Sequence, residues 1–133
     1  MLNLSKATDY ALLFLTNLAR QPDRHWNVRS ASERLHISRR FLANITHQLA
    51  RNGIIATSKG PRGGVTLLKS PAKLTIGDVV EIFEGPVSMV DCVYTDKTCE
   101  RGEKCMMYVF WKSMSEDIRK TMHTTTLADL GEN

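Results

Sequence analysis

Apolar residues in the first half of the chain recur at intervals of three and four, the spacing that gathers them on one face of an α-helix. The pattern is interrupted at Gln21-Pro22 and at His36-Ile37-Ser38, and it ends at Asn52-Gly53. We therefore expect three helices joined by short turns. Their buried faces are expected to carry Ala7, Tyr10, Ala11, Phe14, Leu15, Leu18 and Ala19, then Val28, Ala31 and Leu35, then Phe41, Leu42, Ile45 and Leu49.

The residues at which each helix would begin support this division. Ser5 precedes the first helix, Asn27 or Ser30 can open the second, and Ser38 precedes the third. Side-chain oxygens of Ser and Asn commonly accept hydrogen bonds from the unpaired N–H groups at a helix start. Basic and polar side chains of the third helix fall largely off its apolar stripe. Two helices across a tight turn, the second of them basic, predict a helix-turn-helix.

The next segment predicts a β-hairpin and then a fourth helix. Residues 54–58 and 65–68 are β-prone and flank the turn-rich sequence Lys59-Gly60-Pro61-Arg62-Gly63-Gly64. A hairpin in this place is interpreted as a wing. Thr75-x-x-Asp78 is a capping box that begins a helix ending at Gly85-Pro86. Its apolar face is expected to hold Ile76, Val79, Val80 and Phe83.

A long helix is expected to begin at Lys104 and to end at the Thr124-Thr125-Thr126 run, with apolar residues on more than one face. These residues are Met107, Tyr108, Phe110, Trp111, Met114, Ile118 and Met122. Because a small domain offers too little surface to cover such a helix, we interpret it as a dimerisation helix, with an ordinary core helix as the alternative. The predicted fold class is mainly α with a small β-hairpin wing.

The predicted organisation has three parts: residues 1–86 as a winged helix-turn-helix DNA-binding domain, residues 87–105 as a cysteine-rich loop, and residues 106–133 as a dimerisation helix with a C-terminal tail. Residues 1–74 contain twelve Lys and Arg against three Asp and Glu, whereas residues 75–133 contain six against eleven. A basic half favours the DNA phosphate backbone as a partner, although a solvated basic face would give the same count.

The chain shows no sign of a membrane segment or of an enzyme active site. The longest apolar run near its start, residues 10–15, is far shorter than the ~20 residues needed to span a bilayer. No paired general acid and base, no nucleophile motif and no phosphate loop beyond the wing is found. We therefore expect a cytoplasmic protein that is not an enzyme, with no membrane partner and no small-molecule substrate.

Three cysteines, Cys92, Cys99 and Cys105, are the only ones in the chain. An odd number does not suit a disulfide framework, and in a reducing compartment clustered cysteines are more often metal ligands or redox sensors. Six and five residues separate them, enough chain to wrap three corners of an iron-sulfur cluster. Zinc prefers closer cysteine pairs and four protein ligands. Zinc binding and a thiol sensor without metal remain the alternatives.

The chain resembles the dimeric winged-helix iron-sulfur repressors typified by IscR and NsrR, and it is more similar to the NsrR branch. The resemblance covers nearly the whole chain. The matching motifs are Leu4-Ser5-x-x-Thr8-Asp9-Tyr10-Ala11-Leu12, Ile37-Ser38, Leu49-x-x-x-Gly53-Ile54, Lys59-Gly60-Pro61-Arg62-Gly63-Gly64-Val65, Ile76-Gly77-Asp78-Val79-Val80, the three cysteines, and Thr126-Leu127-Ala128-Asp129-Leu130.

This resemblance implies a homodimer in which each protomer binds one cluster, 4Fe-4S in preference to 2Fe-2S, and the metal state sets the affinity for a palindromic double-stranded operator. IscR-like proteins carry a histidine three residues after the third cysteine, but Tyr108 stands there in this chain. NsrR-like proteins carry an aspartate at the position of Asp9 that reaches the cluster of the other subunit. Other interpretations of the fourth ligand stay open: Asp9 as an ordinary first-turn acid, or ligation by Asp91, Asp96, Glu100, Glu103 or His123.

Candidate DNA contacts follow from the predicted helix-turn-helix and wing. The third helix presents side chains suited to reading base edges in the major groove, because Arg pairs with guanine and Asn with adenine. Serines at helix starts suit phosphate contacts, and a wing arginine suits a narrow minor groove. The candidate residues are Ser30, Ser38, Arg39, Arg40, Asn44, His47, Lys59 and Arg62. We expect a regulator whose cluster senses nitric oxide, redox or iron-sulfur status.

Overall fold

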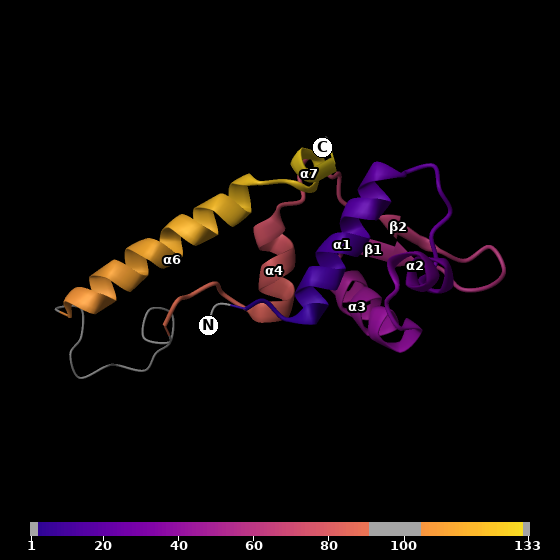
Figure 1. Ribbon diagram of the computed structural model, residues 1–133. Helices are drawn as coiled ribbons and strands as arrows, with labels where there is room; N and C mark the ends of the chain where they lie inside the picture. The colour runs from indigo at the N-terminus through magenta and orange to yellow at the C-terminus, as the bar shows by residue number, and fades with distance from the viewer. Residues whose placement is uncertain (1–2, 91–104, 132–133) are drawn as a thin grey trace.

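The computed structural model describes residues 3–90 and 105–131, and within them it confirms the predicted mainly helical fold with a two-stranded hairpin. Figure 1 shows the hairpin at one side of a helical body and a long helix along the opposite side. The elements are α1 (Lys6–Arg20), α2 (Val28–Leu35), α3 (Arg39–Arg51), β1 (Ile55–Thr57), β2 (Val65–Leu67), α4 (Ile76–Glu84), α6 (Met106–Thr124) and α7 (Leu127–Gly131).

The predicted helix starts are confirmed by hydrogen bonds. The Ser5 and Ser38 hydroxyls accept from the backbone N–H groups of Thr8 and Phe41. Asn27, rather than Ser30, is the N-cap of α2, and the two residues form a reciprocal capping box. The capping box of Thr75 and Asp78 at the start of α4 is also present. Local side-chain chemistry therefore fixes where each of these helices begins.

The hydrophobic core lies where α1, α3 and the hairpin meet. Most residues predicted for it are fully buried, while Tyr10, Phe41, Ile76 and Phe83 pack partly buried against it. Buried residues of this cluster include Ala11, Phe14, Leu15, Leu18, Ala31, Leu42, Ile45, Leu49 and Val79. Along each helix they recur at intervals of three and four residues. They are the positions that the sequence pattern placed on the buried face.

The wing is an antiparallel pair in which Ile55 lies opposite Leu67 and Thr57 opposite Val65. Both strands are shorter than the predicted stretches. A bridge between Trp26 and Val65 attaches the segment before α2 to β2, and the Val65 N–H donates to the Trp26 carbonyl at 2.7 Å. This attachment was not predicted from the sequence, because Trp26 lies in no β-prone run.

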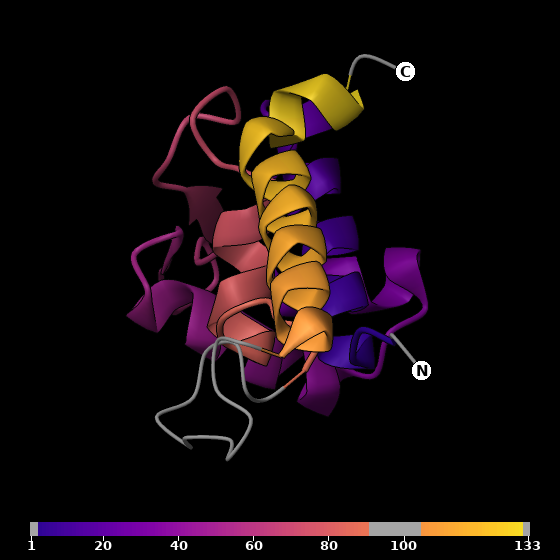
Figure 2. The ribbon, with the colours of Figure 1, turned by 90° about the vertical axis from the view of Figure 1, so that its left-hand side faces the viewer.

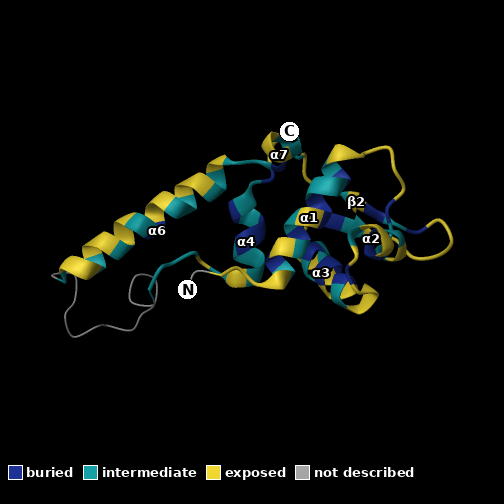
Figure 3. Ribbon diagram, viewed as in Figure 1, coloured by how far each residue is buried: buried dark blue, intermediate teal, exposed yellow. Residues whose placement is uncertain are grey.

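The long helix α6 begins at Met106, two residues later than predicted, and ends at Thr124 as expected. It lies against α4, which separates it from α1 (Figures 1 and 2). Its only fully buried residue is Ser115. Figure 3 shows much of α6 exposed to solvent. At its start the large apolar side chains of Met106, Met107, Val109 and Phe110 are 86%, 53%, 60% and 48% exposed.

The short helix α7 was not predicted; the sequence suggested only a tail. Thr126 and Asp129 cap its start reciprocally: the Thr126 N–H donates to Asp129 Oδ2 at 2.8 Å, and the Asp129 N–H donates to Thr126 Oγ1 at 3.2 Å. Leu127 is fully buried in the core, where α7 packs on α1. Of the described residues, none forms a helix long and apolar enough to cross a membrane.

Candidate DNA interface and cysteine-ligand residues

The candidate reading face of α3 is open to solvent. Arg39, Arg40, Asn44 and His47 are all exposed, whereas the opposite face of the helix carries Leu42, Ile45 and Leu49 at 0 to 1% exposure. The apolar anchoring of one face therefore presents the basic and amide side chains on the other. This geometry suits a helix that enters the major groove, as the second helix of a helix-turn-helix does.

Glu33, which was not among the predicted site residues, lies beside this face. Its Oε1 atom is 3.6 Å from Arg29 Nε and 3.7 Å from Arg39 Nη2. Glu33 is the only acid between Asp23 and Asp78, and the i, i+4 spacing of Arg29 and Glu33 was the available signal. Because all three side chains are more than half exposed, these ion pairs contribute little to stability. Their consequence is that Arg39 has a carboxylate neighbour on the candidate reading face.

A hollow of about 260 Å³ lies between the start of α2 and the wing. Asn27, Arg29, Ser58 and Gly64 are among the residues that line it. The candidate wing residues Lys59 and Arg62 are exposed on the adjoining hairpin loop, which projects beside α2 in Figure 1. Helix N-termini and flanking cations favour anions, so this hollow suits a phosphate of the DNA backbone.

The two candidate serines lie at helix starts as predicted, but both hydroxyls already make local hydrogen bonds. Ser38 Oγ caps α3, and Ser30 Oγ donates to the Asn27 carbonyl at 3.2 Å. The unpaired backbone N–H groups of a helix start also carry partial positive charge. These positions therefore retain the features that suit a phosphate contact.

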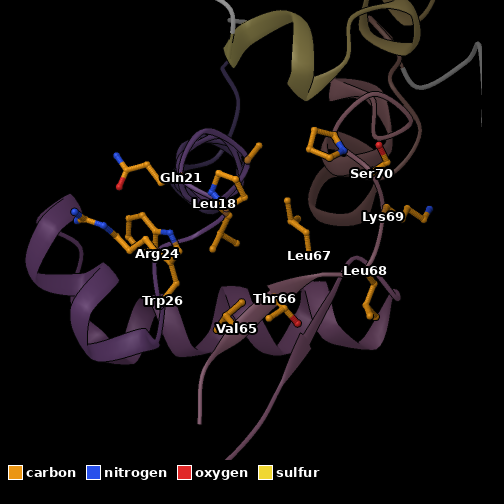
Figure 4. Close-up of a pocket in the computed structure, with 13 residues that line it drawn as sticks. Leu18, Gln21, Arg24, Trp26, Val65, Thr66, Leu67, Leu68, Lys69 and Ser70 are labelled. Atoms are coloured by element: carbon orange, nitrogen blue, oxygen red, sulfur yellow. The ribbon is translucent and has the colours of Figure 1, made fainter. Parts of the chain in front are cut away.

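A second hollow, of about 340 Å³, lies between the end of α1 and strand β2. Figure 4 shows Leu18, Trp26, Val65 and Leu67 lining it, with Lys69 at one side. Its lining contains no Asp, Glu, His or Cys. It therefore lacks the paired acid and base that most hydrolytic and transfer reactions use.

Asp9 is exposed in the first turn of α1. Beside it, Glu84 at the end of α4 accepts hydrogen bonds from the Thr8 hydroxyl at 2.6 Å and the Ser5 N–H at 2.8 Å. Figure 1 shows this end of α1 next to the end of α4, where residues 86–90 leave the domain. Asp9 is thus placed on the side of the domain where the chain leads toward the cysteine segment.

The bonds from Thr8 and then Ser5 hold the pKa of Glu84 below its ordinary value of 4.5. A lowered folded-state pKa stabilises the fold above the unfolded-state pKa, and this contribution is lost as the pH falls through the folded-state pKa. We expect Glu84→Gln to lower the free energy of unfolding at neutral pH and to have a progressively smaller effect below about pH 4.5. Urea denaturation across this range, with the exposed Glu116→Gln as control, measures it; a deficit independent of pH would contradict the assignment.

Of the three cysteines, only Cys105 lies within the described residues; Cys92 and Cys99 lie outside them. Cys105 is the N-cap of α6, and its carbonyl accepts from the Val109 N–H. The positive end of a 19-residue helix dipole stabilises an anionic thiolate there. Across residues 3–90 and 105–131, no three His, Cys, Asp or Glu side chains form a metal site on their own. The predicted ligand set therefore stays a prediction.

His123, another candidate for the fourth ligand, makes side-chain hydrogen bonds with α4 and its N-cap. Its Nε2 atom lies 3.0 Å from Glu81 Oε1, and its Nδ1 atom lies 3.4 Å from the Thr75 hydroxyl. Both ring nitrogens thus have protein partners. Tyr108, which stands where a histidine ligand was considered, is partly buried on α6.

A helix-turn-helix with an exposed basic second helix, followed by a hairpin, defines a winged helix-turn-helix protein. The sequence profile of the Rrf2 family, described as an iron-dependent transcriptional regulator, matches residues 4–133. The chain belongs to the Rrf2 family. It is a transcriptional regulator and not an enzyme, as the sequence predicted.

Two similar proteins support this assignment, and a solved structure shares the fold. The transcriptional regulator IscR of Erwinia tasmaniensis is 33% identical over 77% of this chain and 61% of its own length, so the match spans about three fifths of that relative. NsrR of Shouchella clausii is 34% identical over 80% of this chain and 72% of its own. The structure of CymR, the global cysteine regulator of B. subtilis, aligns with 99% of this chain and 98% of the CymR chain. The TM-score is 0.80 and the sequence identity is 24%, so the two proteins share a fold.

Proposed function

We propose that the protein is a homodimeric repressor that binds a palindromic double-stranded operator, and that an iron-sulfur cluster controls its operator affinity. The observation that carries the DNA-binding part is the exposed basic face of α3 on a helix anchored by its opposite apolar face. Residues 1–86 would form the DNA-binding unit, residues 87–105 the ligand segment, and residues 106–133 the dimerisation helix and tail.

The roles proposed for the DNA-contacting residues follow from their places. Arg39, Arg40, Asn44 and His47 on α3 would read base edges in the major groove. The helix starts at Ser30 and Ser38 would hold phosphates, and the cations of the wing would follow the adjacent backbone and minor groove. The wing cations are Lys59 and Arg62.

Cys92, Cys99 and Cys105 would hold the cluster, with Asp9 of the partner protomer as a fourth ligand. Three thiolates are soft donors of the kind that iron-sulfur clusters and zinc prefer, whereas a carboxylate is a hard and more easily displaced ligand. A cluster with one labile ligand supplies iron that nitric oxide or oxygen can reach. The match to an iron-dependent family and the 34% identity to an NsrR support this choice over an isolated metal-free thiol group.

A second candidate function is a thiol-redox or zinc sensor of the same fold. The metal-free thiol form is favoured by the lack of a fourth soft ligand, because the chain has only three cysteines and has Tyr108 where a histidine ligand was considered. The zinc form would need a fourth protein ligand from elsewhere in the chain or from the partner. The absorption spectrum of anaerobically purified protein, with iron and acid-labile sulfide per protomer, separates the two. We expect a coloured protein that contains both; colourless protein with one zinc per protomer, or with neither metal, would favour the second candidate.

DNA binding is expected to weaken steeply with salt, because residues 1–74 carry an excess of nine positive charges. Arg40→Ala or Asn44→Ala should each cost roughly 1 to 3 kcal/mol on the selected operator and much less on random duplex, since a base contact is lost. Fluorescence anisotropy at several salt concentrations measures both, with Lys112→Ala on α6 as control. A flat salt response, or equal losses on both duplexes, would contradict these roles.

A further inference from the structure

Polar side chains of α6 bind α4 and the segment that follows it. Ser115, the one fully buried residue of α6, accepts a hydrogen bond at 2.9 Å from the N–H of Met89, which lies after the end of α4. One turn further, Arg119 Nη2 lies 3.5 Å from Glu81 Oε1. After another turn, His123 Nε2 reaches the same Glu81 oxygen at 3.0 Å. Glu81 therefore ties two successive turns of α6 to one point on α4.

The His123 ring is also enclosed at the start of α4. Its Nδ1 atom lies 3.4 Å from Thr75 Oγ1 and 3.8 Å from Asp78 Oδ1. Its flat face lies against Gly77, where an added Cβ would come within 2.6 Å of the ring. A proton on Nε2 lets the ring donate to Glu81 while Nδ1 accepts from the Thr75 hydroxyl. Only glycine at position 77 leaves room for the ring in this place.

Backbone hydrogen bonds hold the C-terminal end of α6 as well. The Ile76 N–H donates to the Thr125 carbonyl at 2.9 Å, and the Leu127 N–H donates to the Leu74 carbonyl at 2.9 Å. By contrast, the apolar side chains at the start of the helix are largely exposed. The structure therefore fixes α6 to its own domain at one end and presents the other end to solvent (Figures 1 and 3).

Partly exposed ion pairs add little to stability, but hydrogen bonds require particular distances and angles. Apolar contacts are less directional, whereas the bonds from Glu81 and the close approach at Gly77 specify one arrangement of the two helices. The effect expected of this group is therefore on the direction of α6 rather than on the stability of the fold.

We propose that Gly77, Glu81, Arg119 and His123 are positioning residues that fix the direction of α6 relative to the DNA-binding unit. In a dimer formed through α6, that direction sets the separation of the two α3 helices, and so it sets which half-site spacing the protein accepts. This inference rests on the proposed function, because it requires a dimer that binds two half-sites.

The test measures the dependence of affinity on half-site spacing. A duplex is selected from a random library with wild-type protein, and its centre is then lengthened or shortened by one to three base pairs. We expect wild type to prefer one spacing, and His123→Ala or Glu81→Ala to reduce that preference by about tenfold, within the usual range of coupling effects. Lys120→Ala, at an exposed position of the same helix, should leave it unchanged, and all variants should bind an isolated half-site equally.

A second arm uses Gly77→Ala, whose added methyl group meets the His123 ring. In the wild-type background it should shift or broaden the spacing preference; in His123→Ala protein it should add nothing, because the ring is gone. Thermal unfolding checks that each variant is folded. If His123→Ala and Glu81→Ala retain the spacing preference, or if Gly77→Ala has equal effects in both backgrounds, this inference fails and the proposed function still stands. A wild-type protein that is monomeric or indifferent to spacing would overturn the proposed function with it.

Discussion

Trp111→Glu is expected to convert the protein from a dimer to a monomer. It should also weaken operator binding by at least about a hundredfold, because a monomer loses the avidity that two linked DNA-binding units gain on two half-sites. Trp111 lies on the stripe of α6 proposed to meet its twin, together with Tyr108, Met114, Ile118 and Met122. A carboxylate buried there would be desolvated without a partner, which opposes association. Sedimentation velocity at micromolar concentration measures the assembly.

The matched control is Ser113→Glu, which makes the same change in charge on the same helix, at an exposed position turned away from Trp111. It should remain a dimer. Large exposed apolar side chains near Trp111, at the start of α6, support this expectation, because exposed apolar patches often mark interfaces. A monomeric wild type, or a Trp111→Glu variant that stays dimeric, would contradict the role of α6.

Replacing Cys92, Cys99 or Cys105 with serine is expected to abolish cluster binding. Each substitution removes one of three thiolates, and a serine hydroxyl is a poor ligand for a soft metal centre. Asp9→Ala should instead leave a cluster that forms but is lost faster, because only a harder ligand is removed. Visible absorption, with iron and sulfide content followed over time under anaerobic conditions, distinguishes these outcomes. Asp23→Ala, which removes another exposed acid, should behave as wild type.

Mixed dimers test whether Asp9 acts on the partner protomer's cluster. A protomer with all three cysteines changed to serine is paired with an Asp9→Ala protomer that keeps its cysteines. If Asp9 completes the partner's site, the mixed dimer has one intact site, and its cluster should be as stable as in wild type. A cluster as labile as in the Asp9→Ala homodimer would mean that Asp9 acts within its own protomer and does not complete the partner's site.

Local signals made much of the fold predictable. Ser5 and Ser38 act within three residues of themselves, so their capping roles can be inferred from sequence. The exposed face of α3 followed from periodicity, because burial of Leu42 and Ile45 determines which side chains face solvent. The sequence could therefore predict which residues α3 presents.

Features that depend on distant parts of the chain were not predicted. The five residues of α7 form a helix because Leu127 packs into a core made by other elements, and so short a helix has little stability of its own. The bond between Glu81 and His123 joins residues 42 positions apart. The bridge from Trp26 to the wing likewise joins segments far apart in the sequence. Each of these contacts exists only after the chain has folded.

We propose that cluster binding and operator binding are coupled, and operator affinity in the two metal states tests this coupling most directly. Apo protein and anaerobically reconstituted protein are titrated against the same selected duplex at one salt concentration, with the cluster content measured in each sample. We expect their dissociation constants to differ by about 5-fold to 150-fold, the usual range of allosteric coupling. Equal affinities would mean that the cluster binds both conformations equally well, and the protein would then not be a cluster-controlled switch.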